Sequence, residues 1–111
     1  MVINMRYDVI IIGAGPGGIF SAYEMVSKSS TLKIAVFESG HALENRKCPI
    51  DGEKIKSCIQ CKSCSIMSGF GGAGAFSDGK YNITNDFGGT LFEHIGKTQA
   101  LDLMRYVDEI N

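Results

Sequence analysis

Near its N-terminus the chain carries two short apolar runs on either side of a segment with helical periodicity. Tyr7–Ile12 is a continuous, largely β-branched run, as expected of a parallel strand covered on both faces. From Pro16 to Lys28 apolar residues recur at spacings of three and four, which predicts an amphipathic helix. Leu32–Phe37 is a second candidate strand. Strand, helix and strand follow one another within about thirty residues, and this order predicts a βαβ unit.

The remainder of the chain is less regular. Between residues 39 and 80 we predict neither helix nor strand, although a stretch of about forty residues without regular structure is unusual in a compact domain. We therefore expect a ligand, a metal or further protein to order it. Lys80–Thr84 is a candidate short strand, and Thr98–Ile110 is an amphipathic helix. On that helix Arg105 and Glu109 have the spacing of an ion pair.

Composition and charge narrow the classes of function. The chain has 111 residues, of which 44% are hydrophobic and 21% are charged, as in a small globular domain. Its net charge of -1 gives no electrostatic reason to expect nucleic acid or an anionic membrane as a partner. The aliphatic run Val9–Ile12 is too short to span a bilayer and lacks the features of a signal peptide. We therefore expect a cytoplasmic protein with no membrane partner.

A glycine-rich hexamer directly follows the first predicted strand and opens the predicted helix. Its pattern, Gly13-x-Gly15-x-x-Gly18, in this position is the dinucleotide-binding fingerprint. Gly13 permits the tight turn, Gly15 lets a pyrophosphate approach the backbone, and Gly18 lets the helix pack close to the strand. The unpaired N–H groups and partial positive charge of the helix N-terminus suit a diphosphate. The predicted dinucleotide contacts in this loop are Gly13, Ala14, Gly15, Pro16, Gly17 and Gly18.

Glu38 ends the second predicted strand, twenty residues after Gly18. The fingerprint places an acidic residue there, whose carboxylate accepts hydrogen bonds from the ribose hydroxyls. A carboxylate also repels a 2′-phosphate, which argues against NADP, and we expect Ser39 to add a contact. The pattern does not separate FAD from NAD, because both contain ADP, and the alternative to both is a plain structural turn. The motif therefore favours an α/β fold with a Rossmann-like dinucleotide-binding βαβ unit.

Longer stretches of the sequence resemble a known family. YDVIIIGAGPGGIFSAYEM followed by VFESG is similar to the N-terminal signature of the glutathione-reductase-like FAD flavoproteins. RKCPI, CIQCKSCSIMSGFGGAGAFSDGKYNIT and DFGGTLFEHIG resemble a group of uncharacterised FAD-dependent dehydrogenases. The resemblance covers essentially the whole chain. It implies an FAD-dependent oxidoreductase, with FAD as its cofactor and a substrate or electron carrier that the sequence does not identify.

Members of that group are several times longer than this chain. The resemblance therefore implies that the chain is the N-terminal portion of an FAD-binding domain, inactive alone, and no catalytic residue is predicted. We expect residues 1–40 to form the ADP-binding βαβ unit and residues 41–80 a loop, rich in cysteine and glycine, on the flavin side. Residues 81–111 are expected to hold the short strand and the C-terminal helix.

A second glycine-rich patch, GFGGAGAFSDGK, lies in that loop. Its intervening residues are small and apolar rather than those of a solvated linker, although a flexible surface loop is the alternative. In the flavoproteins that the chain resembles, this loop lies along the pyrophosphate and ribityl chain. The resemblance implies FAD contacts from Gly72, Ala73, Gly74 and Ser77. Arg46 and Lys47 could add charge near the phosphates or the adenine, or could form a solvated basic pair.

The four cysteines, Cys48, Cys58, Cys61 and Cys64, have the spacing C-x9-C-x2-C-x2-C. Short gaps let thiolates converge, so these residues could hold zinc or an iron–sulfur cluster. Free thiols in a loop and a redox-active pair are the alternatives. Two other functions therefore stay open beside the flavoenzyme: a nucleotide-binding module without catalysis, and a metal or iron–sulfur module built on the cysteines.

Overall fold

The computed structural model describes residues 4–110 and divides the chain into two compact units, Met1–Phe76 and Ser77–Asn111. In chain order its elements are β1 (Val9–Ile12), α1 (Pro16–Lys28), β2 (Ile34–Phe37), a 3₁₀ helix (Leu43–Asn45), α2 (Leu91–Ile95) and α3 (Lys97–Ile110). The unit boundary falls inside the loop that we expected to extend to residue 80. Within the described range, none of the helices has both the length and the apolar character needed to cross a membrane.

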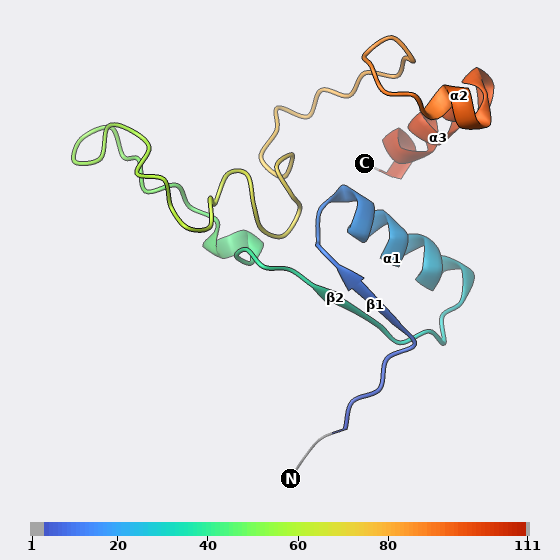
Figure 1. The fold of residues 1–111 in the computed structure, drawn as a ribbon, viewed down its shortest axis with the longest axis horizontal. Coiled ribbons are helices and arrows are strands. Elements are labelled where there is room, and N and C mark those ends of the chain that lie inside the picture. Colours follow the sequence, from blue (N-terminus) through green and yellow to red (C-terminus); the bar gives the residue numbers. More distant parts are fainter. Residues whose placement is uncertain (1–3, 111) are drawn as a thin grey trace. The chain divides into compact units, whose positions relative to one another are not determined.

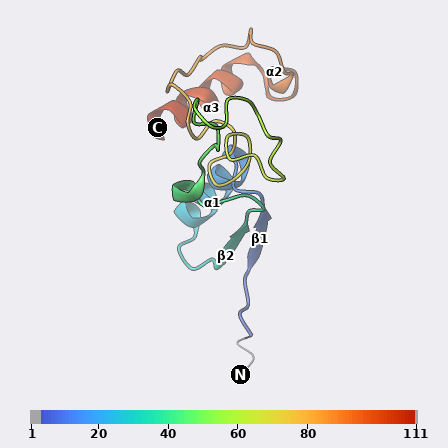
Figure 2. The ribbon, with the colours of Figure 1, turned by 90° about the vertical axis from the view of Figure 1, so that its left-hand side faces the viewer.

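β1 and β2 form a two-stranded parallel sheet in which Val9 lies beside Ile34. The Gly13 N–H donates a hydrogen bond of 2.7 Å to the Phe37 carbonyl oxygen, so the pairing continues into the glycine-rich hexamer. α1 packs along this sheet and contacts both strands (Figure 1 and Figure 2). The two strands and the helix therefore lie where the sequence predicted them, in a mixed α/β arrangement.

α1 covers one face of the sheet. A Cβ atom added at Gly18 of α1 would lie 3.2 Å from Ile11 Cγ2, which places Ile11 on the helix side. Alternate strand residues point to opposite faces, and Ile10 and Ile12 on the other face are 59% and 81% exposed. Our expectation that β1 is covered on both faces is therefore wrong for the described residues, because α1 is the one helix among them that contacts the sheet.

Residues 38–76 of the first unit contain one short element, the 3₁₀ helix Leu43–Asn45, and are otherwise irregular. Figure 1 shows this segment looping away from β2 and returning to the N-terminal end of α1. Local hydrogen bonds shape it. Asp51 Oδ1, for example, accepts bonds of 2.8–2.9 Å from the backbone N–H groups two, three and four residues later. The predicted lack of helix and strand is thus confirmed, apart from the 3₁₀ turn.

In the second unit, α2 and α3 pack against each other. Gly96 separates them with φ +84°, a conformation that favours glycine, and so allows the chain to turn between the helices. Ala100 of α3 is fully buried, and three apolar residues spaced three apart on the same helix, Leu101, Met104 and Val107, are half-buried. The amphipathic helix is therefore confirmed, whereas α2 was not predicted.

Two expectations for the second unit are wrong. Lys80–Thr84 is irregular rather than a strand, because the described part of this unit holds no second strand with which it could form a ladder. Arg105 Nη1 pairs with Asp102 Oδ1 over 3.1 Å, one turn earlier, instead of with Glu109. Both side chains of this pair are well exposed, so the bond contributes little to stability.

Candidate functional site

The fingerprint runs from the loop between β1 and α1 into the first turn of α1, and each of its three glycines has a different environment. Gly13 has φ +101°, a backbone conformation that L side chains rarely adopt. At Gly18 an added Cβ would overlap the Gly13 carbonyl oxygen and lie 3.1 Å from its carbon. Gly13 is therefore required by the turn, and Gly18 by the close approach of α1 to the loop and β1.

Gly15 differs from both. Its φ of -79° and ψ of -177° are extended values that any residue adopts. Apart from Gly15 and its two chain neighbours, no described residue has an atom within 4 Å of the position that a Cβ would take. Neither the conformation nor the packing of the chain explains a glycine here, and its open side faces free space.

That space lies at the N-terminus of α1. The first helical bond runs from the Ile19 N–H to the Gly15 carbonyl oxygen over 3.0 Å, and Pro16 occupies the first turn. In the described structure no side chain caps this end, and the first turn carries no acidic residue. The N–H groups of Gly17 and Gly18 belong to this uncapped first turn, where the helix carries a partial positive charge. This end of α1 therefore suits an anion.

Glu38 follows β2 and lies against this loop. Its Oε2 accepts a hydrogen bond from the Ala14 N–H, and its Oε1 accepts one from the Gly40 N–H, each over 2.8 Å. These two bonds, the Ala14 bond first, lower the pKa of the Glu38 carboxyl below its usual 4.5, and the charge of Arg46 acts in the same direction. Glu38 is therefore a charged residue that ties the end of β2 to the glycine-rich loop. Sequence reasoning assigned it only to the ribose.

The second glycine-rich patch lies directly against the first. The Gly71 N–H donates to the Ala14 carbonyl oxygen over 2.8 Å. A Cβ added at Gly72 would lie 3.2 Å from Gly15 Cα and 3.1 Å from Pro16 Cδ. Ala14, between them, is 1% exposed. Gly71 and Gly72 of the second patch thus lie beside Ala14, Gly15 and Pro16 of the first patch, within the first unit.

The other predicted residues of the second patch are placed differently. Ala73 and Gly74 lie on an exposed turn, and no described atom lies within 4 Å of a Cβ added at Gly74. Ser77 begins the second unit, where its Oγ accepts a hydrogen bond of 3.2 Å from the Gly79 N–H. Ser39 lies beside Glu38 and is exposed.

Arg46 was predicted near the phosphates or the adenine, but its side chain is only 5% exposed. The guanidinium donates four hydrogen bonds of 2.7–2.8 Å to the backbone carbonyl oxygens of Ser65, Ile66, Phe70 and Gly72. Lys47, its neighbour in the predicted basic pair, is exposed. Sequence reasoning missed the role of Arg46 because a basic pair in a loop gives no sign of which member is buried.

The cysteines are free thiols, with Cys64 half-buried and Cys48, Cys58 and Cys61 exposed. Among residues 4–110, no group of three or more histidine, cysteine, aspartate or glutamate side chains has an arrangement that could hold a metal ion. The predicted ligand set is thus not assembled in this structure, and metal binding stays a prediction. The backbone N–H groups of Met67 and Ile66 lower the pKa of the Cys64 thiol.

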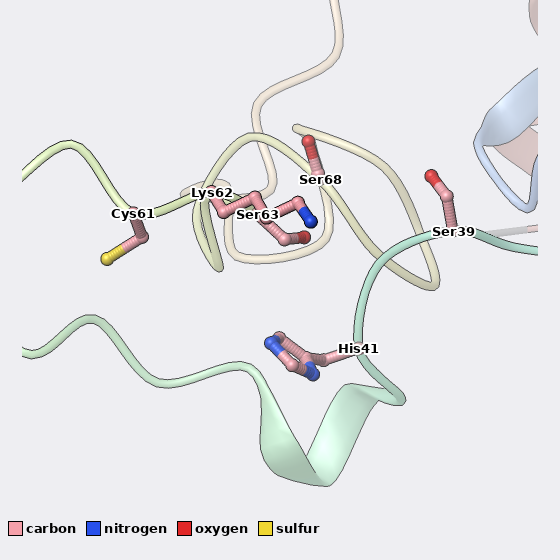
Figure 3. Close-up of a pocket in the computed structure, with 6 residues that line it drawn as sticks. All are labelled: Ser39, His41, Cys61, Lys62, Ser63 and Ser68. Carbon is pink, nitrogen blue, oxygen red and sulfur yellow. The ribbon is translucent and has the colours of Figure 1, made fainter.

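A pocket of about 650 Å³ opens beside the end of β2. Figure 3 shows that Ser39 and His41, from the segment after β2, lie on one side of the pocket. Cys61, Lys62 and Ser63, from the cysteine-containing segment, lie on the other side. Apart from Cys61, its lining residues carry polar or charged side chains: Ser39, His41, Lys62, Ser63 and Ser68. The pocket thus begins at the residue after Glu38, and it offers hydroxyl, imidazole and ammonium groups to a ligand.

Comparisons with known proteins add no assignment: no family model, curated protein or solved structure matches this chain.

Proposed function

We propose that this chain binds the ADP part of FAD at the loop between β1 and α1, as a portion of an FAD-dependent oxidoreductase. In such an enzyme the flavin performs the redox chemistry, and the protein binds and orients it. The residues of this chain supply backbone N–H groups for the pyrophosphate and a carboxylate for the ribose.

The observation that carries the proposal is the free space beside Gly15. Gly13 and Gly18 are explained by the turn and by packing, but nothing in the described chain requires a glycine at position 15. A pyrophosphate close to this backbone would supply the missing reason, because a side chain would occupy its place. The uncapped N-terminus of α1 beside this space provides the complementary partial charge.

The environment of Glu38 is compatible with the ribose. Each carboxylate oxygen accepts one backbone hydrogen bond, from Ala14 or from Gly40. A carboxylate offers about four acceptor positions, so acceptor capacity remains for the hydroxyls of a ribose. Its charge opposes a 2′-phosphate, which favours FAD or NAD over NADP.

FAD rather than NAD is favoured by the resemblance of GFGGAGAFSDGK to the flavin-side loop of FAD-dependent dehydrogenases. Gly71 and Gly72 of this stretch lie beside Ala14 and Gly15. A pyrophosphate bound at Gly15 would therefore have the second glycine-rich patch next to it.

The proposal is tested by titrating the ¹⁵N-labelled chain with ADP, FAD and NADP while recording amide chemical shifts. We expect ADP and FAD to shift the amides of Gly15, Gly17 and Gly18, and NADP to do so more weakly. Gly15→Val should abolish these shifts and leave the far-ultraviolet circular dichroism unchanged. Ser27→Val, which adds the same side chain at the exposed end of α1, should bind like the wild type.

Two results would count against the proposal. The first is a wild-type chain that binds neither ADP nor FAD at millimolar concentration. The second is a Gly15→Val variant that binds as the wild type does, which would mean that the nucleotide lies elsewhere.

A further inference from the structure

The most buried charged side chain among the described residues belongs to Arg46, and the dinucleotide chemistry proposed above does not use it. We infer that Arg46 is a positioning residue: its guanidinium holds the second glycine-rich segment, Gly69–Gly72, against the first, Gly13–Pro16, and so shapes the nucleotide site without touching the nucleotide. The inference rests on the proposed function for the identity of the ligand, but not for the contact between the two segments.

The hydrogen bonds of Arg46 join two parts of the irregular segment. Nε and Nη2 donate to the carbonyl oxygens of Ser65 and Ile66, immediately after the last cysteine. Nη1 donates to those of Phe70 and Gly72, on either side of Gly71. Four of the five N–H groups of the guanidinium are thus used on backbone acceptors. The central carbon of the guanidinium, Cζ, also lies 5.1 Å from the centre of the Phe76 ring.

This arrangement requires an arginine rather than a positive charge alone. A guanidinium is a planar fork with donors in fixed directions, whereas a lysine has three donors on one atom and could not reach all four carbonyl oxygens. The backbone is also shaped for this side chain. Gly69 has φ +118°, and a Cβ there would lie 2.8 Å from Arg46 Cδ and 2.7 Å from the His41 carbonyl oxygen.

The segment that Arg46 holds makes the contacts with the first glycine-rich loop. The Gly71 N–H donates to the Ala14 carbonyl oxygen, and Gly72 packs against Gly15 and Pro16. Gly69 lies so close to Gly40 that a Cβ on Gly40 would be 2.5 Å from its nitrogen. Without Arg46, the carbonyl oxygens of Phe70 and Gly72 would lose their donor. Gly71 lies between them and would no longer be held in place for its hydrogen bond to the Ala14 carbonyl oxygen.

The same position also excludes a direct role at the phosphates in this conformation. An arginine that is 5% exposed, with its donors on four carbonyl oxygens, has little capacity to bind an anion in solvent. If Arg46 acted through its charge, the Arg46→Lys variant would retain most of the ADP affinity of the wild type. If it acts by positioning, Arg46→Lys and Arg46→Gln should be equally defective.

The experiment measures amide hydrogen exchange in the nucleotide-free chain, followed by ADP titration of the same proteins. In Arg46→Lys and Arg46→Gln we expect the amides of Phe70 and Gly71 to exchange at least about tenfold faster, because local opening becomes easier. The amides of α1 should keep their protection. ADP affinity should fall about tenfold or more in both variants. Lys56→Gln, an exposed residue of the same irregular segment that loses the same charge, is the matched control and should behave as the wild type.

A second variant perturbs the same contact from the other side. Gly69→Ala retains Arg46 but places a methyl group 2.7 Å from the His41 carbonyl oxygen and 2.8 Å from Arg46 Cδ, in a backbone conformation that L side chains rarely adopt. It should therefore also speed exchange at Phe70 and Gly71. The inference is overturned by unchanged exchange in Arg46→Lys, by loss of protection throughout α1 and the sheet, or by full ADP affinity despite faster exchange. If the wild type binds no ADP, the proposed function fails and the nucleotide part of the inference fails with it. The exchange rates still decide whether Arg46 holds the two segments together.

Discussion

The Glu38 carboxylate accepts a hydrogen bond of 2.8 Å from the backbone N–H of Ala14, twenty-four positions earlier in the sequence. The bond connects the end of β2 to the loop that begins α1. The second oxygen of the Glu38 carboxylate accepts a hydrogen bond from the Gly40 N–H, where the chain leaves the sheet. One side chain therefore fixes both sides of the space in which we place the ribose and the pyrophosphate.

We expect Glu38→Ala to weaken ADP binding about tenfold, because the ribose hydroxyls of the bound nucleotide would lose the carboxylate that we propose as their acceptor. Thermal stability should fall as well, since the Ala14 and Gly40 amides lose the same group. Amide-shift titration measures the affinity, and Glu53→Ala, on an exposed turn, is the control. If stability falls but affinity does not, Glu38 holds the loop and does not hold the ribose.

The pH dependence of stability follows from the same bonds. They lower the pKa of Glu38 in the folded chain below its usual 4.5. A carboxyl whose pKa is lower in the folded than in the unfolded state contributes its stabilisation fully above the unfolded-state pKa, and loses it as the pH falls through the folded-state pKa. We therefore expect the melting-temperature difference between wild type and Glu38→Gln to be largest near neutral pH and to shrink below about pH 4.

Asp51, whose pKa is lowered by the backbone N–H groups of Ile55, Glu53 and Lys54, also titrates in this range. Its contribution is present in both proteins and therefore cancels in the difference between them. A difference in melting temperature that stays constant from neutral to acidic pH would mean that the Glu38 bonds do not stabilise the fold.

The two adjacent glycines at the start of α1 provide a matched pair for the packing argument. A methyl group at Gly18 would overlap the Gly13 carbonyl oxygen, whereas one at Gly17 meets no described atom within 4 Å. We expect Gly18→Ala to lower the free energy of unfolding by about 1–3 kcal/mol, the usual cost of overpacking. Gly17→Ala should be neutral or stabilising, because alanine favours a helix over glycine. Urea denaturation of both variants checks this, and equal stabilities would contradict the predicted helix–loop contact.

The regular elements around the glycine-rich loop could be predicted because local sequence determines them. The β-branched run of β1, the periodicity of α1 and the glycines between them depend on neighbours in the chain. α2 was missed because a helix of five residues gives too short a periodic pattern. Lys80–Thr84 was misassigned for the opposite reason: its residues suit a strand, but a strand also needs a partner in space.

The contacts of the candidate site could be predicted only in part. Spacing placed Glu38 at the end of a strand, but not its bonds to Ala14 and Gly40, which depend on the path of the loops. The burial of Arg46 could not be predicted for a similar reason. Its acceptors are backbone carbonyl oxygens, which every residue has, so no sequence pattern identifies them. Contacts between side chain and backbone across an irregular segment become visible only in the structure.

The arrangement of the cysteine segment leads to the last prediction. Cys48, Cys58 and Cys61 are exposed, Cys64 is half-buried, and all four are free thiols. We therefore expect a thiol-specific chromogenic reagent to titrate four thiols per metal-free native chain, the same number as in denaturant. Fewer thiols in the native chain would contradict the exposure seen here. Adding Zn²⁺ then tests the ligand set that the C-x2-C-x2-C spacing predicts, because thiolates bound to zinc react slowly. If the four thiols react at the same rate with and without Zn²⁺, the segment does not bind zinc, and free thiols are the better description of its chemistry.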